Sequence, residues 1–380
     1  MKKRYKILFV VEAMGGGVFT YIVNLSNRLI EEYDIYIAYA TRPQTPANYC
    51  DYFDKKIHLI HVKNFSRSIN LSSDVRAFFE IRKIAAHICP DVIHLHSSKA
   101  GILGRWAFNG RKTALFYTPH GYSFLMSDLK WVKKALYKGI EVISAAKYCT
   151  TISCSRGEHQ ETLKLTKRAV YVNNGICTAE LDAMLNESCE VPHPFTVFTI
   201  GRICTQKNPS LFNSIAQKMP DIPFVWIGDG ELRDQLTEPN IEITGWLSRK
   251  DALIRAMQAD VFLLPSLWEG LPIALLEAMY MKKLCIVSNI IGNNDVIKNG
   301  LNGFLCETAE EFAAIIEKLK NGTNDEYINQ AHTDIIDCYN LDSMAESYGN
   351  IYRTAIEDSR IPNPVAELHT LRRYLLTLCE

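Results

Sequence analysis

"KILFVVEAMGGGVFTYIVNL" (residues 6–25) passes from an apolar, β-branched run through three consecutive glycines into a helical pattern. A short apolar run bounded by glycines is typical of a buried strand in a parallel sheet. The same succession returns in "TVFTIGRICTQKNPSL" (residues 196–211), where a strand ends at Gly201 and Pro209 suits the first turn of a helix. Two units of strand, glycine turn and helix predict two doubly wound α/β domains.

Strand-like runs alternate with helical stretches along both halves of the chain. The first half contains KILFVV, YDIYIAYA, KIHLIHV, DVIHLH, ALFYTP, YCTTISCS and AVYVNNGI, and the second contains TVFTIGRI, IPFVWIG, IEITGWL, ADVFLLPS and LCIVSN. This alternation predicts parallel sheets with helices on both faces. We expect two facing Rossmann-like domains, residues 1–190 and 191–352, and a C-terminal helical tail, residues 353–380, that packs back on the first domain. Ligands bind such sheets at the carboxyl ends of the strands.

Composition indicates a soluble protein. Of the 380 residues, 47% are hydrophobic and 22% are charged, which is ordinary for globular domains. The opening apolar run is too short for the core of a signal peptide, and no run approaches the roughly 20 residues of a membrane span. The eleven cysteines include no C-x-x-C pair, which predicts reduced thiols in the cytoplasm and disfavours disulfides or a zinc site.

The net charge of zero hides an asymmetry between the halves. Residues 1–190 carry 26 Lys and Arg against 17 Asp and Glu, whereas residues 191–380 carry 16 against 25. The basic first half predicts an anionic partner, with chance drift in surface charge as the alternative.

Glycines and cations follow the first strand of each half. Gly16 and Gly17 would let the backbone approach a phosphate at a helix amino terminus, or would simply form a tight turn. A dinucleotide fold would want a carboxylate after the second strand, where this chain has Arg42, so a dehydrogenase is disfavoured. Arg202 and Lys207 flank the second loop, and two cations beside a helix start can hold a diphosphate. Either one alone would also suit a solvated basic loop.

"PSLWEGLPIALLEAM" (residues 265–279) places Glu269 before a helix and Glu277 inside it. A carboxylate among apolar residues is costly unless it is hydrogen-bonded, so Glu277 has either a protein partner or a ligand. A sugar nucleotide fits: the amides of Gly270 and Leu271 would meet phosphate or sugar, Glu269 sugar hydroxyls, and Glu277 ribose hydroxyls. A catalytic pair of carboxyls, as in glycoside hydrolases, is the competing interpretation, but we find no partner acid placed for it.

Together, "GR…QKN", "GDGELRDQL", "EGLPIALLEAM", "DVIHLHSSKAG", "TPHG" and "VNNGI" resemble the retaining glycosyltransferases of family four, which have the GT-B fold. The resemblance implies that Arg202 and Lys207 hold the donor diphosphate and that Gly16 and Gly17 close on it. It also implies that Glu277 binds ribose, and that Glu269 with the amides of Gly270 and Leu271 binds the donor sugar. His120 would lie beside that sugar near the reacting carbon; the alternative is a core histidine at a strand end.

The chain departs from the family pattern at three positions. Cys177 replaces an aspartate of the "NGxD" motif, and Asn293 and Asp295 replace the second glycine and the glutamate of "GG-x-x-E". A D-x-D motif is absent from the sequence, so we expect no metal, with Arg202 and Lys207 neutralising the diphosphate. No cofactor is expected, because the nucleotide sugar is a substrate.

The expected activity is retaining transfer of a hexosyl or N-acetylhexosaminyl group. The donor would be a nucleotide sugar, a UDP-sugar by expectation, and the acceptor a polyprenyl-diphosphate-linked glycan in capsule, exopolysaccharide or lipopolysaccharide synthesis. Because no carboxylate is evidently placed to attack the anomeric carbon, we expect a same-face substitution. Two alternatives stay open: a nucleotide-sugar 2-epimerase of the same fold, and a non-catalytic nucleotide-sugar-binding subunit. No nucleic-acid partner is expected.

Two basic segments of the first half are candidates for acceptor and membrane contact. In "HLHSSKAGILGRWAF" (residues 94–108), the candidates for a lipid diphosphate are His96, Ser97, Lys99 and Arg105, with a helix start and surface charge as the alternative. In residues 128–147, a stripe that is typical of core packing comprises Leu129, Val132, Leu136, Ile140 and Ile143. The candidates for anionic headgroups are Lys130, Trp131, Lys133, Lys134 and Lys138, or else they form a solvated basic face. We therefore expect a cytoplasmic protein bound peripherally to the inner face of the plasma membrane.

Overall fold

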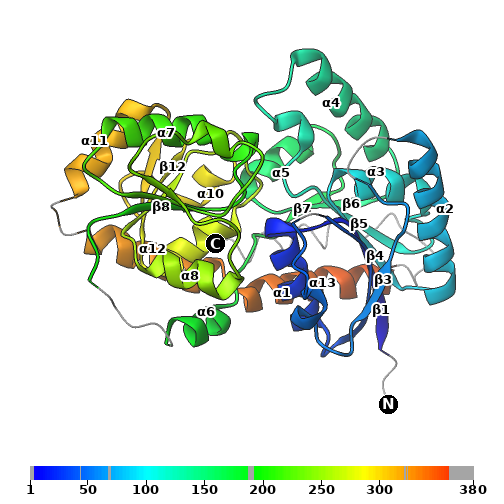
Figure 1. The fold of residues 1–380 in the computed structure, drawn as a ribbon. Helices are drawn as coiled ribbons and strands as arrows, with labels where there is room; N and C mark the ends of the chain where they lie inside the picture. The colour runs from blue at the N-terminus through cyan, green and yellow to red at the C-terminus, as the bar shows by residue number, and fades with distance from the viewer. Residues whose placement is uncertain are drawn as a thin grey trace.

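The computed structural model describes residues 4–42, 44–66, 70–186, 192–320, 322 and 324–358. It contains two α/β domains side by side, each with a parallel sheet between layers of helices (Figure 1). The predicted architecture of two doubly wound domains is confirmed.

The first sheet has seven parallel strands in the order β3-β2-β1-β4-β5-β6-β7. Their bounds are β1 Tyr5–Met14, β2 Tyr33–Thr41, β3 His58–His61, β4 Val92–His96, β5 Ala114–Thr118, β6 Thr150–Ser153 and β7 Ala169–Tyr171. The helices of this half are α1 Gly16–Leu29, α2 Leu71–Ile88, α3 Ser98–Ala107, α4 Trp131–Ala145, α5 Arg156–Leu163 and α6 Thr178–Leu185, with the short 3₁₀ helices η1 Tyr49–Tyr52 and η2 Ser123–Leu125.

Central strand β1 is buried on both faces, as its continuous apolar run predicted. Alternate side chains of a strand point to opposite faces, so Ile7 and Phe9 pack in the core that contains residues of α1, whereas Leu8 and Val10 pack in the core that contains residues of α2. Ile7 lies opposite Ile35 of β2 and Val92 of β4 in the parallel registers. This double burial fixes the carboxyl end of β1, and with it the glycine loop, in the middle of the sheet.

The second sheet has six parallel strands in the order β10-β9-β8-β11-β12-β13. Their bounds are β8 Val197–Ile200, β9 Phe224–Ile227, β10 Ile241–Ile243, β11 Val261–Leu264, β12 Leu284–Ser288 and β13 Phe304–Cys306. The helices are α7 Pro209–Lys218, α8 Arg249–Met257, α9 Ile273–Tyr280, α10 Asn293–Val296, α11 Ala309–Leu319, α12 Asp325–Cys338 and α13 Leu341–Asp358, with η3 Thr205–Lys207 and η4 Arg233–Gln235. Helix α7 begins at Pro209, where the sequence predicted a helix start.

Helix α13 returns the chain to the first domain (Figure 1). The two connections between the domains pair at Ile176, whose N–H donates to Tyr339 O and whose carbonyl accepts from Leu341 N, both at 2.9 Å. In α13, Tyr348 and Tyr352 are buried in the core of the first domain. The boundary expected at residue 352 therefore falls inside this helix. Residues 187–191, at the other expected boundary, and residues 359–380 of the expected tail lie outside the described residues.

None of the helices that the structure describes combines the length and the apolar character needed to cross a bilayer.

Candidate active site

Loops from the two domains meet through three glycines. A Cβ on Gly270, just before α9, would lie 2.9 Å from the backbone nitrogen of Gly121 in the loop after β5. A Cβ on Gly292, which precedes α10, would lie 2.4 Å from the carbonyl oxygen of Gly270. Side chains at either position would force the loops apart, so glycine is needed for this approach. The "TPHG" and "EGLP" segments, far apart in sequence, are therefore in direct contact.

Glu269 lies at this junction with three donors around its carboxylate. Lys207 Nζ donates to Oε1 at 2.7 Å, Ser266 Oγ to the same oxygen at 2.8 Å, and Gln206 Nε2 to Oε2 at 3.1 Å. The carboxylate is buried, so these charge-assisted bonds offset its desolvation. The structure thus brings Lys207 and Glu269, predicted as diphosphate and sugar ligands, into one ion pair.

Arg202 lies on the same side of the second domain, two residues after the end of β8. Its guanidinium is partly exposed, and its Nε lies 3.7 Å from Glu231 Oε2, too long for a strong pair. The backbone of Gly201 before it is held by Trp226, whose Nε1 donates to Gly201 O at 2.8 Å. Arg202 precedes η3 and Lys207 is its last residue, so both lie on the connection from β8 to α7, and a shared contact with a diphosphate stays a prediction.

Glu277 has a protein partner that sequence analysis did not identify. Only 4% of Glu277 is exposed, and its Oε1 lies 2.7 Å from Nη1 of Arg249, the first residue of α8. Burial raises the pKa of the Glu277 carboxyl, and Arg249 only partly offsets this. Burial would lower the pKa of Arg249, but the carboxylates of Glu277 and Glu180 outweigh it and raise that pKa. A ribose-binding role for Glu277 stays a prediction, and Arg249 is the residue that any such role must accommodate.

The amino terminus of α1 has open space at its glycines. A Cβ added to Gly16 or Gly17 would meet no described atom within 4 Å, so packing inside the protein does not require glycine at these positions. Gly16 also has a φ of +57°, which a residue with a side chain rarely adopts. Helix α1 lies against α9 of the second domain. On the other side of α9, Asn174 Nδ2 donates to Leu271 O at 2.8 Å and fixes the "EGLP" loop.

His120 belongs to a cluster of neutral histidines. Its φ of +56° is unusual for a residue with a side chain, and its ring packs edge-on against Tyr21 at 4.6 Å. Burial lowers the pKa of His120 to about 3, and burial followed by the neighbouring histidines lowers the pKa of His96 well below its usual value. His96 Nδ1 lies 3.1 Å from His120 Nε2. Both rings are therefore uncharged at neutral pH, and one of them donates to the other.

The surroundings of His96 decide which ring donates. Its Nε2 is buried with no hydrogen-bond partner. An unpaired buried N–H is rarer in proteins than an unpaired acceptor, so the proton of His96 belongs on Nδ1. His96 then donates to His120 Nε2, and His120 carries its proton on Nδ1. This arrangement gives His120 one N–H for a ligand, and it makes His96 a residue that orients His120 rather than one that contacts a lipid.

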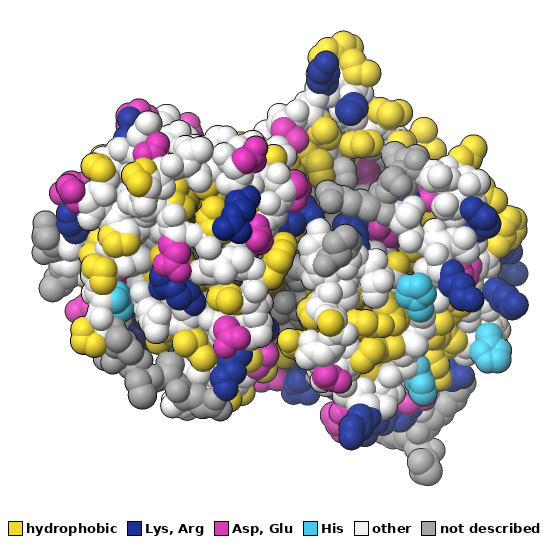
Figure 2. Space-filling model, in the orientation of Figure 1, with side chains coloured by type: hydrophobic (Ala, Val, Ile, Leu, Met, Phe, Trp, Pro, Cys, Tyr) yellow, Lys and Arg dark blue, Asp and Glu magenta, His cyan; other side chains and the backbone are white. Residues whose placement is uncertain are grey.

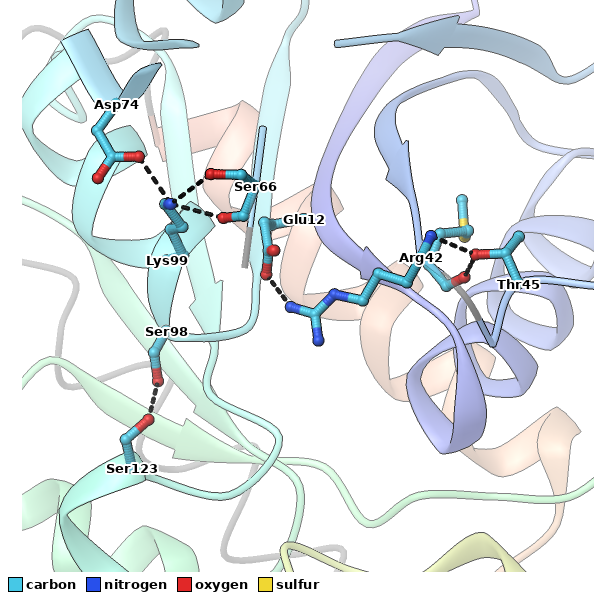
Figure 3. A network of polar contacts seen from close by, with 9 residues as sticks. Glu12, Arg42, Thr45, Ser66, Asp74, Ser98, Lys99 and Ser123 are labelled. Carbon is cyan, nitrogen blue, oxygen red and sulfur yellow. Dashed lines mark hydrogen bonds and ion pairs between the residues drawn. The ribbon is translucent and has the colours of Figure 1, made fainter. Parts of the chain in front are cut away.

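Of the other predicted acceptor residues, Lys99 has protein partners. Lys99 Nζ lies 2.7 Å from Asp74 Oδ1 and donates to Ser66 O at 2.6 Å, while the neighbouring Ser98 bonds Ser123 at 3.1 Å (Figure 3). Ser97 precedes α3 with a φ of +72°, and its side chain does not cap that helix.

The prediction for Arg105 is wrong. Only 2% of it is exposed, and its Nη2 donates to Glu141 Oε2 at 2.6 Å. Tyr117 OH donates to the other oxygen of the same carboxylate at 3.1 Å. The period of α3 turns Arg105 towards α4 and the sheet, so its charge is used inside the first domain and not on a lipid.

Three carboxylates were missed or noted only in passing, and two of them, Glu158 and Asp295, lie at the junction. Glu158 accepts from the N–H groups of Gly121 and Cys154 at 2.7 and 2.8 Å, and burial raises its pKa. Its signal was the S-x-x-E spacing from Ser155, which caps α5. Asp295, noted only as a departure from the family pattern, accepts from Gly157 N at 2.7 Å and so links α10 to α5 of the other domain. Glu12 is buried at the end of β1 and pairs with Arg42 (Figure 3).

Helix α4 presents much of its apolar stripe to solvent: Val132, Leu136 and Ile143 are exposed, so the core packing typical of such a stripe is not found there, whereas Leu129 and Ile140 are half-buried. The exposed fractions are 57% for Val132, 58% for Leu136 and 61% for Ile143, and 80% of Trp131 is exposed. Within the helix only Glu141 and Ser144 are buried, because the side facing α3 is the polar one. Hydrophobic side chains and basic ones project together at the top of the first domain, where α4 lies (Figures 1 and 2).

Comparisons with known proteins agree with this architecture. The family model "Glycosyltransferase Family 4" matches residues 15–180, and "Glycosyl transferases group 1" matches residues 186–333. The UDP-Gal:alpha-D-GlcNAc-diphosphoundecaprenol alpha-1,3-galactosyltransferase of Escherichia coli is 32% identical over 337 residues, covering 80% of this chain and 85% of the relative. A GalNAc-alpha-(1->4)-GalNAc-alpha-(1->3)-diNAcBac-PP-undecaprenol alpha-1,4-N-acetyl-D-galactosaminyltransferase of Campylobacter jejuni is 25% identical, covering 84% of this chain and 89% of the relative.

Among solved structures, sucrose-phosphate synthase from Thermosynechococcus elongatus aligns with a TM-score of 0.77 at 15% identity. The alignment covers 92% of this chain and 99% of that structure.

Proposed function

This chain belongs to the family-four glycosyltransferases of the GT-B fold, and from that membership we propose that it transfers a sugar from a UDP-sugar to a polyprenyl-diphosphate-linked glycan with retention of configuration. The observation that carries the proposal is the Lys207–Glu269 pair beside Gly270, with His120 and Gly121 of the other domain against it. A cation and a carboxylate lie next to the point where the backbone of His120, a neutral histidine, touches the other domain. Such a junction can hold a charged donor and exclude water around it.

The donor diphosphate belongs at Lys207 and Arg202. In this proposal Lys207 turns from Glu269 to the diphosphate when donor binds, which frees the carboxylate to accept from sugar hydroxyls. The cations and the amide groups at the start of α7 stabilise the charge that grows as the diphosphate leaves. A diphosphate oxygen takes the proton from the acceptor hydroxyl, which attacks the same face of the sugar, so configuration is retained. His120 donates from Nδ1 to a sugar hydroxyl.

Metal independence is part of the proposal. The charge of the diphosphate is matched by Arg202 and Lys207, and Lys207 is held beside a helix start by its pair with Glu269. Among the described residues, His, Cys, Asp and Glu side chains do not gather in a group of three or more suited to a metal ion. Activity that survives a strong chelator would support this part of the proposal, and activity that is lost on chelation and restored by Mg²⁺ would contradict it.

The relatives guide the choice of substrates. The Escherichia coli relative is named for a UDP-galactose donor and an N-acetylglucosamine-diphosphoundecaprenol acceptor, and the Campylobacter jejuni relative for a polyprenyl-diphosphate-linked acceptor. We therefore propose a hexosyl or N-acetylhexosaminyl donor and a lipid-linked acceptor in the assembly of a cell-surface polysaccharide. These relatives favour transfer over the 2-epimerase and the non-catalytic subunit.

Helix α4 is the proposed contact with the membrane. The chain runs from His120 through η2 into α4, so only ten residues separate His120 from Trp131. In this connection Ser127 Oγ donates to Leu267 O at 3.4 Å, beside Glu269. Exposed apolar and aromatic side chains interleaved with Lys130, Lys133, Lys134 and Lys138 suit the interface of an anionic bilayer. A bilayer at α4 would bring a lipid-linked acceptor to the junction. We propose that this bilayer is the inner face of the plasma membrane and that the protein binds it peripherally from the cytoplasm.

The test is transfer in detergent with defined substrates. Wild type is incubated with UDP-galactose or UDP-N-acetylglucosamine, with and without an N-acetylglucosamine-diphosphate lipid, and the anomeric configuration of the product is read by NMR. We expect an α-linked product that forms only with acceptor. Lys207→Ala and Arg202→Ala should each lower turnover by about 100-fold or more, and Lys318→Gln, an exposed charge of the second domain, should not.

Each other outcome has a definite meaning. Conversion of UDP-N-acetylglucosamine without acceptor would indicate the epimerase, and an inverted product would refute the same-face substitution. Donor binding with neither transfer nor hydrolysis would indicate the binding subunit. Near-normal turnover in both alanine variants would remove Lys207 and Arg202 from the mechanism.

A further inference from the structure

A basic and aromatic pocket lies at the carboxyl end of α4, away from the junction of the domains. Its volume is about 310 Å³, and its lining includes Arg111, Lys147 and Arg168 with the rings of Trp106 and Tyr148. Among the described residues that line it there is no carboxylate, and these three cations make no ion pair with a described residue. The pocket therefore has an uncompensated positive charge.

The rings hold the cations in place. Lys147 Nζ lies 3.8 Å from the centroid of the Trp106 ring, and Arg168 Cζ lies 4.6 Å from that of Tyr148. Arg111 Cζ lies 5.8 Å from the same Tyr148 ring. A guanidinium stacked on a ring keeps the N–H groups along its edge available, and two such edges suit the oxygens of a phosphate. The Trp106 ring is anchored by Nε1, which donates to Ser144 Oγ at 3.3 Å.

The two walls of the pocket are fixed to each other by backbone packing. A Cβ on Gly110 would lie 1.7 Å from the carbonyl oxygen of Tyr148, so the loop after α3 touches the segment after α4 only because residue 110 is glycine. The pocket is thus part of the folded first domain and not a chance approach of long side chains.

Its position points to the membrane and not to the sugar acceptor. The apolar stripe of α4 leads to the pocket: Ile143 is exposed one turn before it, and half of Trp106 and 39% of Tyr148 are exposed beside it. Aromatic rings with a polar edge favour the headgroup region of a bilayer. The loop from His120 enters α4 at the opposite end, and a helix of 15 residues is roughly 22 Å long. A lipid diphosphate that reaches His120 does not reach this pocket.

We propose that Arg111, Lys147 and Arg168, with Trp106 and Tyr148, bind the headgroup phosphate of an anionic bilayer lipid. This site rests on the proposed docking of α4. It would hold the second end of the helix, so that α4 lies along the membrane plane with its Trp131 end beneath the acceptor.

The experiment tests whether positive charge alone is enough for vesicle binding or whether the forked guanidinium donors are also needed. Binding to phosphatidylcholine vesicles with and without phosphatidylglycerol is measured by flotation for wild type, R111Q/R168Q and R111K/R168K. Loss of two charges near an anionic surface corresponds to roughly 30-fold weaker binding, and we expect R111Q/R168Q to approach that loss. R111K/R168K keeps the charge and loses the forked donors, so we expect its binding to fall by about fivefold or more. K298Q/K318Q, which removes two exposed charges from the second domain, should bind as wild type does.

Wild-type binding by R111K/R168K would overturn the proposal, because diffuse charge would then suffice. Binding by R111Q/R168Q that equals that of K298Q/K318Q would overturn it as well. Folding and donor binding are checked in each variant by the thermal shift that UDP produces, which a pocket remote from the junction should not change. Transfer to a short-chain acceptor in detergent tests the proposed function separately, since this reaction needs no bilayer. If the wild-type protein shows no transfer in this assay, the result counts against the proposed function and not against the lipid site.

Discussion

Lys207 and Glu269 form an ion pair in the very place where each was expected to meet a ligand. The pair explains how a buried carboxylate and a cation can stand at the junction without donor, because each compensates the other. Glu277 has a comparable partner in Arg249. The partner of Glu269 offsets the cost of its burial, and Arg249 offsets that cost in part for Glu277. The two pairs also differ in their surroundings: Glu269 lies at the junction of the domains, and Glu277 lies beside the start of α8.

The two glutamates should therefore respond differently to substitution. Glu269→Gln should keep UDP affinity and lower transfer by about 100-fold. Glu277→Gln should weaken UDP binding and also lower the free energy of unfolding by about 1–3 kcal/mol, because Arg249 then keeps only its longer contact with Glu180, at 3.4 Å. Calorimetric titration with UDP and urea unfolding measure both effects.

The matched control for Glu277 is the double variant R249M/E277M. Replacing a buried ion pair by apolar side chains is often neutral for stability, so this variant should recover much of the lost stability without recovering UDP affinity. Full UDP affinity in the double variant would show that Glu277 does not contact ribose.

The histidine cluster predicts acid sensitivity. The pKa of His120 is lowered to about 3, whereas an unfolded histidine has a pKa of about 6.5. The unfolded chain therefore binds more protons between these values, so the stability contributed by a neutral His120 is present above pH 6.5 and is lost as pH falls towards 3. The slope is about 1.4 kcal/mol per pH unit for one histidine. Urea unfolding at pH 7 and pH 5.5 should show a smaller loss in His120→Gln than in wild type. An equal loss in both would mean that His120 is protonated in the folded protein.

At the scale of elements, α4 shows that an amphipathic pattern does not say which face is buried. Its apolar stripe is exposed, and the carboxylate of Glu141 faces inward to Arg105. An exposed apolar stripe is a liability in water unless something covers it. The combination of this stripe with lysines is the reason to expect a bilayer there.

Substitutions on α4 should separate its apolar and its charged contributions. W131S/L136S should change the free energy of unfolding by no more than about 0.5 kcal/mol, because both side chains are exposed. It should weaken binding to phosphatidylglycerol vesicles at high salt as well as at low salt. Glutamine at Lys130, Lys133, Lys134 and Lys138 should weaken binding mainly at low salt. Flotation at two salt concentrations measures both. Binding by wild type that is insensitive to salt, or equal binding by all three proteins, would contradict docking through α4.

At the scale of the whole molecule, the domains are joined by a small set of specific contacts. The two segments that connect the domains are hydrogen-bonded to each other at Ile176 and Leu341. The contacts of Asp295 with α5 and of Gly270 with Gly121 lie at the junction itself. Closure of such domains keeps water from the reacting sugar and completes the site. Asp295 contributes a charge-assisted bond across the domains, to the N–H of Gly157 at the positive end of α5.

Removing this contact should loosen closure without disrupting either domain. We expect Asp295→Ala to lower transfer by about tenfold, an estimate based on the loss of one positioning contact, and to raise the share of donor that is hydrolysed. Transfer and hydrolysis of a UDP-sugar are measured side by side. Glu310→Gln, which removes an exposed ion pair with Lys218 inside the second domain, is the control. An unchanged ratio of hydrolysis to transfer in Asp295→Ala would show that this contact does not govern closure.

Much of the fold followed from local patterns in the sequence. Apolar runs such as residues 7–11 are continuous because their strands are covered on both faces, and glycines follow them because the carboxyl ends of strands need tight turns. The positions of Arg202, Lys207, Glu269 and His120 in loops that follow strands were expected from the same patterns, and parallel strands bring such loops to one edge of each sheet. The resemblance to family four added the roles expected for these residues.

What the sequence by itself determined is the two-domain α/β architecture, the family and the loops after the strands where the candidate site lies, since these depend on residues close together in the chain. Only the tertiary structure decided that Arg249 lies against Glu277, that Arg105 is buried with Glu141 and that the apolar stripe of α4 is exposed. Periodicity shows which side chains share a face of a helix, but whether another element covers that face depends on packing between distant segments. For the same reason, the partner of a buried charge is set by the fold, because the residues that neutralise one another are neighbours in space and not in sequence.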